Sequence, residues 1–186
     1  MRIKARNAVV IAGALAAMVL PGTAAHASGM GGDADPVHIK NVGLNDIGPD
    51  GGCLTAVYDH DNGGTVIRVR PCGTSWGQTW HVEELSEDWA GRLYFKVRDA
   101  KDDCLELIGE DAPENARLGL RPCTDEAGFQ VFRGTKADWE SPTWRVSGQG
   151  GDAWLRAYDE YSAPYTTQTA DWPGASAEWQ TEPLRG

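Results

Sequence analysis

The stretch from Cys53 to Trp80 decides the fold, because the chain contains it more than once. It reads CLTAVYDHDNGGTVIRVRPCGTSWGQTW, with a polar loop between two apolar runs and a cysteine in each run. The same order of features returns at 104–132, where CLEL opens the copy, RLGLRPC carries its second cysteine and QVF ends it. A third copy at 154–179 keeps WLRA, TQTADW and AEW but has no cysteine. The copies begin at residues 53, 104 and 154, and such nearly equal spacing predicts a repeat architecture.

Within each copy, apolar and polar residues alternate over short segments. The segments TVIRVR at 65–70 and LYFKVR at 93–98 both show this pattern, and a first strand is expected at 37–42. Alternation with period two is typical of half-buried strands, and Gly and Pro interrupt the chain between the segments. No segment after Leu20 keeps apolar residues at helical spacing over three turns. The sequence therefore predicts an all-β protein.

One copy is too small to bury its own apolar face, so the copies must pack together. We predict three repeats, at about 37–88, 89–139 and 140–184, arranged around one axis as a closed barrel capped by hairpins, a β-trefoil. Three large aromatic side chains occupy the same place in each copy, and we expect them to fill the shared core; they are Trp80, Phe132 and Trp179.

The first 27 residues have the features of a secretory signal peptide. Three basic residues precede a 13-residue apolar run at 8–20, which is too short to span a bilayer comfortably, and small residues stand at 25 and 27. We expect cleavage before Ser28 and a secreted protein; a retained membrane anchor is the alternative. Residues 28–36 are small and polar and read as a flexible lead-in to a domain at 37–184.

The net charge of the chain limits the classes of partner that it is expected to bind. Removing the leader leaves 14 basic and 27 acidic side chains, a net charge of −13. Such a chain is repelled by phosphate backbones and by anionic lipids. We therefore expect neither nucleic-acid nor membrane binding, and we expect a monomer.

The four cysteines of an exported chain indicate two disulfides. Four cysteines allow three pairings, and the repeat selects the one in which each bond closes its own copy: Cys53 with Cys72, and Cys104 with Cys123. The alternative, a metal site, has no Cys-x-x-Cys pair to support it, and the histidines are scattered. We expect no metal and no cofactor.

Together the Cys-Leu openings, the disulfide within each copy and the Gln-x-Trp ending resemble the ricin B-chain-type lectins, over residues 37–184. The resemblance implies a β-trefoil that binds galactose-type sugars in shallow pockets, at most one per repeat. Such a pocket uses an Asp two residues after the first cysteine, an aromatic platform, and an Asn or Gln near the second cysteine. The carboxylate accepts hydrogen bonds from sugar hydroxyls, and the ring stacks on the sugar.

This sequence departs from the family at those positions. The Asp position holds Thr55, Glu106 and Arg156, so only the second copy keeps a carboxylate. The place of the platform holds Arg70, Arg121 and Ala170. The fold therefore carries over more firmly than the galactose pocket does.

Glu106 is the leading candidate for a ligand acceptor, with Asn115 and Arg121 as companions; the alternative is a surface Glu106–Arg121 ion pair. Other candidates are Asp59, in a loop that could face a sugar, hold a cation or form a solvated turn, and Gln168, which precedes the platform position. Tyr158 belongs to a tyrosine cluster, with 161 and 165, that could stack on sugar, contact a protein or pack locally.

No catalytic motif was found, so we expect a binding protein and not an enzyme. The leading hypothesis is a secreted lectin-like protein that recognises a glycan or polysaccharide. The alternative is a trefoil that has lost sugar binding and acts as a protein-binding or inhibitor module.

Overall fold

The computed structural model describes residues 35–44, 46, 48, 50–61, 63–108, 116–125, 128–137, 143–148, 153–157, 159, 163–168 and 174–184. The expected signal peptide and most of the lead-in lie outside these residues. No helix in the described part is long and apolar enough to cross a membrane.

The prediction of an all-β fold is confirmed. The described residues form strands joined by turns and by four short 3₁₀ helices, and the strands are β1 (Val37–Asn41), β2 (Gly52–Asp59), β3 (Gly64–Pro71), β4 (Trp80–Glu87), β5 (Leu93–Asp99), β6 (Asp103–Ile108), β7 (Arg117–Pro122), β8 (Phe132–Lys136), β9 (Trp144–Gly148), β10 (Ala153–Arg156), β11 (Tyr165–Gln168) and β12 (Glu178–Pro183). The 3₁₀ helices are η1 (Val42–Leu44), η2 (Trp76–Gln78), η3 (Gly128–Gln130) and η4 (Ala175–Ala177). The first strand therefore ends one residue earlier than expected, where η1 begins.

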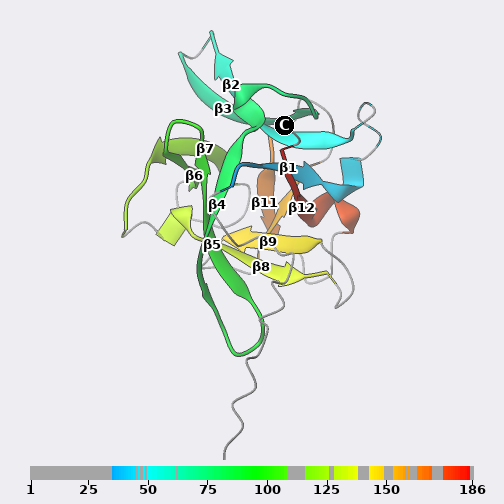
Figure 1. The fold of residues 1–186 in the computed structure, drawn as a ribbon, viewed down its shortest axis with the longest axis vertical. Coiled ribbons are helices and arrows are strands. Elements are labelled where there is room, and N and C mark those ends of the chain that lie inside the picture. Colours follow the sequence, from blue (N-terminus) through cyan, green and yellow to red (C-terminus); the bar gives the residue numbers. More distant parts are fainter. Residues whose placement is uncertain are drawn as a thin grey trace, which may run out of the picture.

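Six strands pair in a closed ring, in the order β1, β12, β9, β8, β5, β4 and back to β1. Strands from the two ends of the domain close this ring, because β1 pairs with β12 from Val37↔Pro183 to Asn41↔Trp179. A closed ring leaves no barrel edge unpaired. This arrangement agrees with the predicted barrel (Figure 1).

Three antiparallel hairpins lie outside the ring: β2–β3, β6–β7 and β10–β11. They meet through β7, which pairs with β3 at Val66↔Gly119 and with β11 at Tyr165↔Arg117. The first two hairpins each contain one disulfide, Cys53–Cys72 and Cys104–Cys123, with Cα atoms 4.9 Å apart in both. The predicted disulfide pairing is confirmed.

The core lies inside the barrel, and the three expected aromatic side chains are in it. Trp80, Phe132 and Trp179 are each at most 1% exposed, which confirms their predicted role. Both indoles also find a hydrogen-bond acceptor, because Trp80 Nε1 donates to Leu54 O at 2.9 Å and Trp179 Nε1 donates to Leu155 O at 3.0 Å. These bonds fasten the hairpins β2–β3 and β10–β11 to the barrel.

Lys96 departs from the predicted alternation, in which it stands on the polar face of its strand. It is only 8% exposed, although the register places it opposite Glu83 on β4. Its ammonium group reaches a backbone carbonyl, donating from Nζ to Thr124 O at 2.9 Å. A buried lysine is tolerated there because its charge has an acceptor.

Candidate functional site

The candidate site is built on the glutamine that ends η3. The Gln130 side chain is 1% exposed and all its polar atoms are used. Its Nε2 donates to Glu106 Oε2 at 2.9 Å and to Pro122 O at 3.0 Å, and its Oε1 accepts from Thr124 N at 3.0 Å. A single amide thus fastens the segment after Cys123 to strand β6.

The first copy of the motif contains the same clamp. Gln78 Nε2 donates to Thr55 Oγ1 at 3.0 Å and to Pro71 O at 2.9 Å, and Gln78 Oε1 accepts from Gly73 N at 2.7 Å. Because both glutamines make equivalent contacts, the Gln of the Gln-x-Trp motif is a structural residue in each place. What differs is the side chain that it holds.

The Thr55 hydroxyl is buried and already makes two hydrogen bonds within the protein. The residue is 6% exposed, its hydroxyl donates to Cys53 O at 2.9 Å, and the same oxygen accepts from Gln78. Glu106 is half-buried, and only its Oε2 is engaged, by Gln130. Its Oε1 has no hydrogen bond or ion pair with any residue that the structure describes. The carboxylate is therefore fixed through one oxygen and open through the other.

In the third copy, the position equivalent to Thr55 and Glu106 holds a positively charged arginine. Arg156 is half-buried, and its Nε donates to Ser176 Oγ at 3.1 Å. Ala177 stands where Gln78 and Gln130 stand, so the amide clamp is missing. Of the three equivalent positions, only the one on β6 presents a carboxylate.

Exposed apolar side chains occur near this carboxylate in the sequence and, for Ile108, on the same face of the strand. Gly119 pairs with Glu106, and a Cβ on Gly119 would lie 2.2 Å from Ile108 Cδ1, so Ile108 lies across the glycine. Ile108 is on the same face of β6 as Glu106, two residues on, and is 42% exposed. Phe129, the residue before the clamping Gln130, is 66% exposed. The site therefore combines an open carboxylate oxygen with exposed apolar surface.

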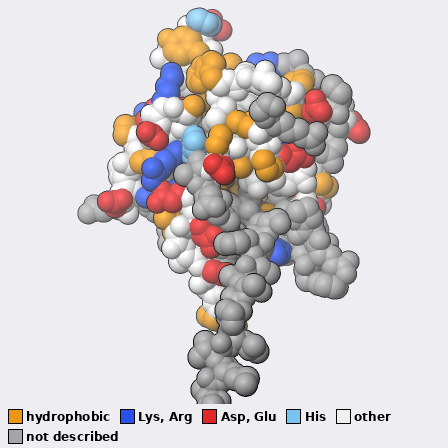
Figure 2. All heavy atoms as spheres, in the orientation of Figure 1, with side chains coloured by type: hydrophobic (Ala, Val, Ile, Leu, Met, Phe, Trp, Pro, Cys, Tyr) orange, Lys and Arg blue, Asp and Glu red, His pale blue; other side chains and the backbone are white. Residues whose placement is uncertain are grey.

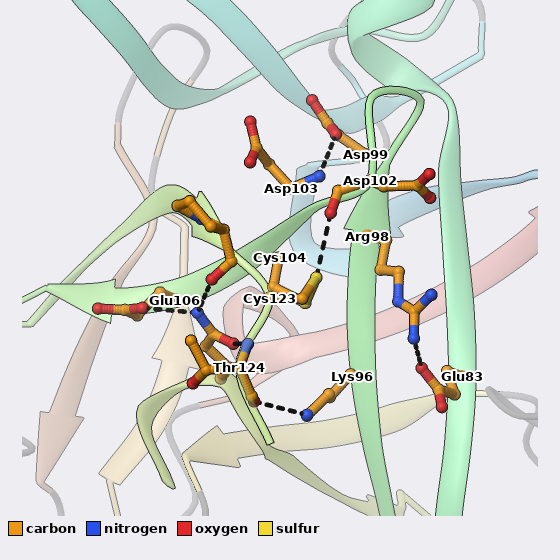
Figure 3. The surroundings of a disulfide bond; sticks show 12 residues. Glu83, Lys96, Arg98, Asp99, Asp102, Asp103, Cys104, Glu106, Cys123 and Thr124 are labelled. Atoms are coloured by element: carbon orange, nitrogen blue, oxygen red, sulfur yellow. Dashed lines mark hydrogen bonds and ion pairs between the residues drawn. A yellow bond between two sulfur atoms is a disulfide. The ribbon is translucent and has the colours of Figure 1, made fainter. Parts of the chain in front are cut away.

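The segment after the disulfide is held from a second side. Thr124 N is bound by Gln130, and Thr124 O accepts from Lys96 Nζ at 2.9 Å. Figure 3 shows Lys96 reaching Thr124 from β5, with Glu106 on the opposite side of the Cys104–Cys123 bond. Both backbone polar groups of Thr124 are thus fixed, which stiffens the wall of the site.

The other predicted site residues are distributed differently. Arg121 is exposed and stands opposite Cys104, and no ion pair joins it to Glu106 in the described part of the chain. The buried amide of Gln130 contacts the Glu106 carboxylate instead, through Oε2. Asp59 ends β2, and its Oδ1 accepts from Asp61 N at 3.0 Å, as in an Asx turn.

Gln168 ends β11 opposite Ala153, and nothing further of its side chain is described. Asn115 and Tyr158 lie outside the described residues, as does Tyr161. Within the described part of the chain, no group of three or more His, Cys, Asp or Glu side chains could hold a metal ion.

Sequence reasoning missed the apolar flank and the clamp. Ile108 and Phe129 gave no signal because an isolated exposed apolar residue is ordinary. The clamp did leave a signal, namely the Gln of the repeated Gln-x-Trp motif. That glutamine indicates the repeat in the sequence, but its contact with Glu106 is visible only in the structure.

A separate hollow of about 510 Å³ lies where β1 and the end of β12 meet the loops at 50–51 and 72–74. Its ionisable side chains include an ion pair, Lys40 Nζ to Glu182 Oε1 at 3.0 Å. Burial lowers the pKa of His38 there, against opposing effects of a Gly73 backbone hydrogen bond and the Glu182 charge. Glu106 does not line this hollow.

No protein-family model matches the chain, and no curated protein matches it. Solved structures do match. They include the BEL β-trefoil (TM-score 0.56, 11% identity, 82% of this chain and 95% of that one) and SeviL bound to asialo-GM1 saccharide (TM-score 0.54, 13% identity, 82% and 100%).

A Polyporus squamosus lectin bound to the epitope Neu5Aca2-6Galb1-4GlcNAc also matches, with a TM-score of 0.60 and 12% identity. The match covers 82% of this chain and half of that lectin. At identities this low, the likenesses establish the fold alone, and the chain folds as a β-trefoil.

Proposed function

We propose that the protein is a secreted carbohydrate-binding protein of the ricin-B type, built of three repeats behind a cleaved leader at 1–27. Its sugar site lies on the β6–β7 hairpin around Glu106. One observation carries the proposal: Glu106 is oriented by Gln130 through Oε2 while Oε1 has no partner among the described residues. A carboxylate held in this way accepts hydrogen bonds from sugar hydroxyls without first losing conformational freedom.

The apolar flank supports the same function. A sugar ring has hydroxyls at its edge and C–H groups on its faces, so its recognition needs polar acceptors beside apolar surface. Ile108 supplies such surface on the same face of β6 as the carboxylate, and Phe129, which precedes the clamping Gln130, is a further exposed apolar side chain. In this proposal the site does not need the usual set of pocket residues. Arg121 stands where the family's aromatic platform is expected, and Ile108 and Phe129 supply apolar surface instead.

The experiment starts from the oxidised protein lacking residues 1–27. A glycan array selects the sugar, and calorimetric titration then compares wild type with Glu106→Gln. This substitution keeps the shape of the side chain and an acceptor for Gln130, but removes the negative charge. Loss of a charged hydrogen bond to ligand is expected to weaken binding about 10- to 100-fold.

Glu84→Gln is the matched control, since Glu84 is an exposed carboxylate on β4 with no contact to the site. It is expected to bind as wild type does. A Glu106→Gln protein that keeps the wild-type dissociation constant overturns the assignment of the site. We also propose binding without catalysis, so mass spectrometry of the bound glycan after prolonged incubation is expected to show it intact.

A further inference from the structure

A second functional surface lies at the end of the β4–β5 hairpin, away from Glu106. Trp89, at the turn of this hairpin, is 95% exposed, and Leu85 on β4 is 43% exposed. In Figure 1 the hairpin extends beyond the other strands, and in Figure 2 hydrophobic atoms lie at its lower end with acidic side chains along it. A fully exposed indole contributes nothing to the core.

The turn that carries Trp89 is firmly ordered by Asp88. Asp88 Oδ1 accepts from Ala90 N at 2.9 Å and from Arg92 N at 3.0 Å, and Oδ2 accepts from Arg92 Nε at 2.7 Å. The backbone adds Gly91 N to Asp88 O at 2.9 Å, and Gly91 has φ +71°, a conformation suited to glycine. Such a turn fixes the backbone from which the indole projects, so less backbone entropy is lost on binding.

Charge surrounds the indole. The segment 83–92 has four acidic residues and one arginine, a net charge of −3. Asp88 pairs with Arg92, and Glu83 pairs with Arg98. Glu84 and Glu87 are exposed and make no hydrogen bond or ion pair with the described residues. The tip is therefore an apolar anchor surrounded by negative charge.

We propose that Trp89 is the anchor of a protein-docking finger, which inserts into an apolar pocket rimmed by Lys and Arg side chains on a partner protein. A projecting indole can only enter a concave surface, and tryptophan is a frequent centre of protein interfaces. The two free glutamates match a basic rim and accelerate association.

Other occupants fit the tip less well. Both oxygens of Asp88, the carboxylate next to Trp89 in the chain, already accept hydrogen bonds within the turn and are not free to hold a sugar. An anionic membrane repels a segment of charge −3. A second copy of the chain carries the same net negative charge, so self-association is opposed as well.

The test places a photo-reactive amino acid at Ala90, beside Trp89, in the full mature chain. The control carries it at Ser75, beside Trp76, a second tryptophan that is exposed (53%) in the described part of the chain. Each is irradiated with the extracellular fluid and cell-surface proteins of the source organism. The protein cross-linked from Ala90 is identified and purified, because capture alone does not establish the pocket.

Binding of the purified partner is then measured by surface plasmon resonance. Trp89→Ala is expected to weaken binding at least about 30-fold, as for an interface hot spot, and Trp76→Ala to leave it unchanged. Glu84→Gln with Glu87→Gln is expected to slow association and reduce its salt dependence. Glu106→Gln is expected to bind the partner normally, which separates this surface from the sugar site.

Several results overturn the proposal. One is cross-linking from Ala90 that does not exceed the Ser75 control. Another is cross-linking only to glycan, to lipid or to a second copy of this chain. A third is a purified partner that binds the Trp89→Ala protein as tightly as wild type. Because Trp89 is exposed, its variants are expected to fold normally, and an unchanged unfolding midpoint confirms this.

Discussion

At the scale of single residues, the protein differs from one motif copy to the next by what its glutamine clamp holds. Gln78 holds a buried threonine hydroxyl that already donates to Cys53 O, whereas Gln130 holds a carboxylate with one open oxygen. The contribution of the clamps to stability is therefore separate from their contribution to ligand binding. Both clamps support the fold, but only the second one positions a group that a ligand can use.

Replacing either clamp with alanine is expected to destabilise the protein. Gln78→Ala removes the bonds to the Gly73 amide and the Pro71 carbonyl, and Gln130→Ala removes the bonds to the Thr124 amide and the Pro122 carbonyl. Each change is expected to lower the free energy of unfolding by about 2–3 kcal/mol. Urea unfolding with the disulfides intact measures this.

The control for the clamp variants is Gln180→Ala, because this amide makes one long bond, to Glu182 at 3.3 Å. We expect it to cost less than about 0.5 kcal/mol. Of the two clamp variants, only Gln130→Ala is expected to weaken sugar binding as well. Equal loss of affinity in both would argue against a site at Glu106.

Two glycines give a matched test of packing around the clamps. An added Cβ at Gly77 meets the backbone oxygen of Ala56 at 2.3 Å, whereas at Gly119 it meets the end of the exposed Ile108 side chain at 2.2 Å. Backbone cannot move as a side chain can. We expect Gly77→Ala to cost about 3 kcal/mol and Gly119→Ala under about 1 kcal/mol. Thermal unfolding distinguishes them; a larger cost at Gly119 would contradict the packing described.

At the scale of elements, the strands were predictable and their contacts were not. Period-two alternation predicted the strands around Ile67 and Phe95, since half-buried strands leave that pattern. Lys96 broke the pattern, because the segment after Cys123 passes over it and supplies a carbonyl from a distant part of the chain. The open oxygen of Glu106 was equally hidden, because it depends on an amide 24 residues away.

Core tryptophans join elements through both packing and a hydrogen bond. Trp179, on β12, is fully buried and donates to Leu155 O on β10. Trp179→Phe removes the donor but keeps most of the volume, and Phe132 occupies the equivalent place in the second copy. We expect a loss of about 2 kcal/mol for Trp179→Phe and about 3–5 kcal/mol for Trp179→Ala. Equal losses in urea unfolding would mean that packing is unimportant here.

At the scale of the whole molecule, pairing of β1 with β12 closes the barrel, and the half-buried His38 on β1 makes the stability of this closure sensitive to pH. Burial lowers the pKa of His38, with Lys40 adding to the effect and Gly73, Glu182 and Asp50 opposing it. The unfolded chain, with a His pKa near 6.5, therefore binds the proton more tightly than the folded protein does.

The contribution of His38 to stability is thus complete above pH 6.5, decreases as the pH falls below 6.5, and levels off below the folded-state pKa. His38→Gln is expected to flatten the pH dependence of the free energy of unfolding in that range. An unchanged slope in His38→Gln would show that other groups control it.

The central claim is that a sugar binds beside Glu106, and nuclear magnetic resonance tests it most directly. The ¹⁵N-labelled protein is titrated with the glycan selected on the array, and its amide shifts are followed. We predict that the largest changes fall on Glu106, Ile108, Thr124 and the side-chain amide of Gln130, while Gly73 and Gln78 stay unaffected. Shift changes confined to the first copy or to the Trp89 tip would contradict the assignment. So would the absence of any shift change at saturating glycan.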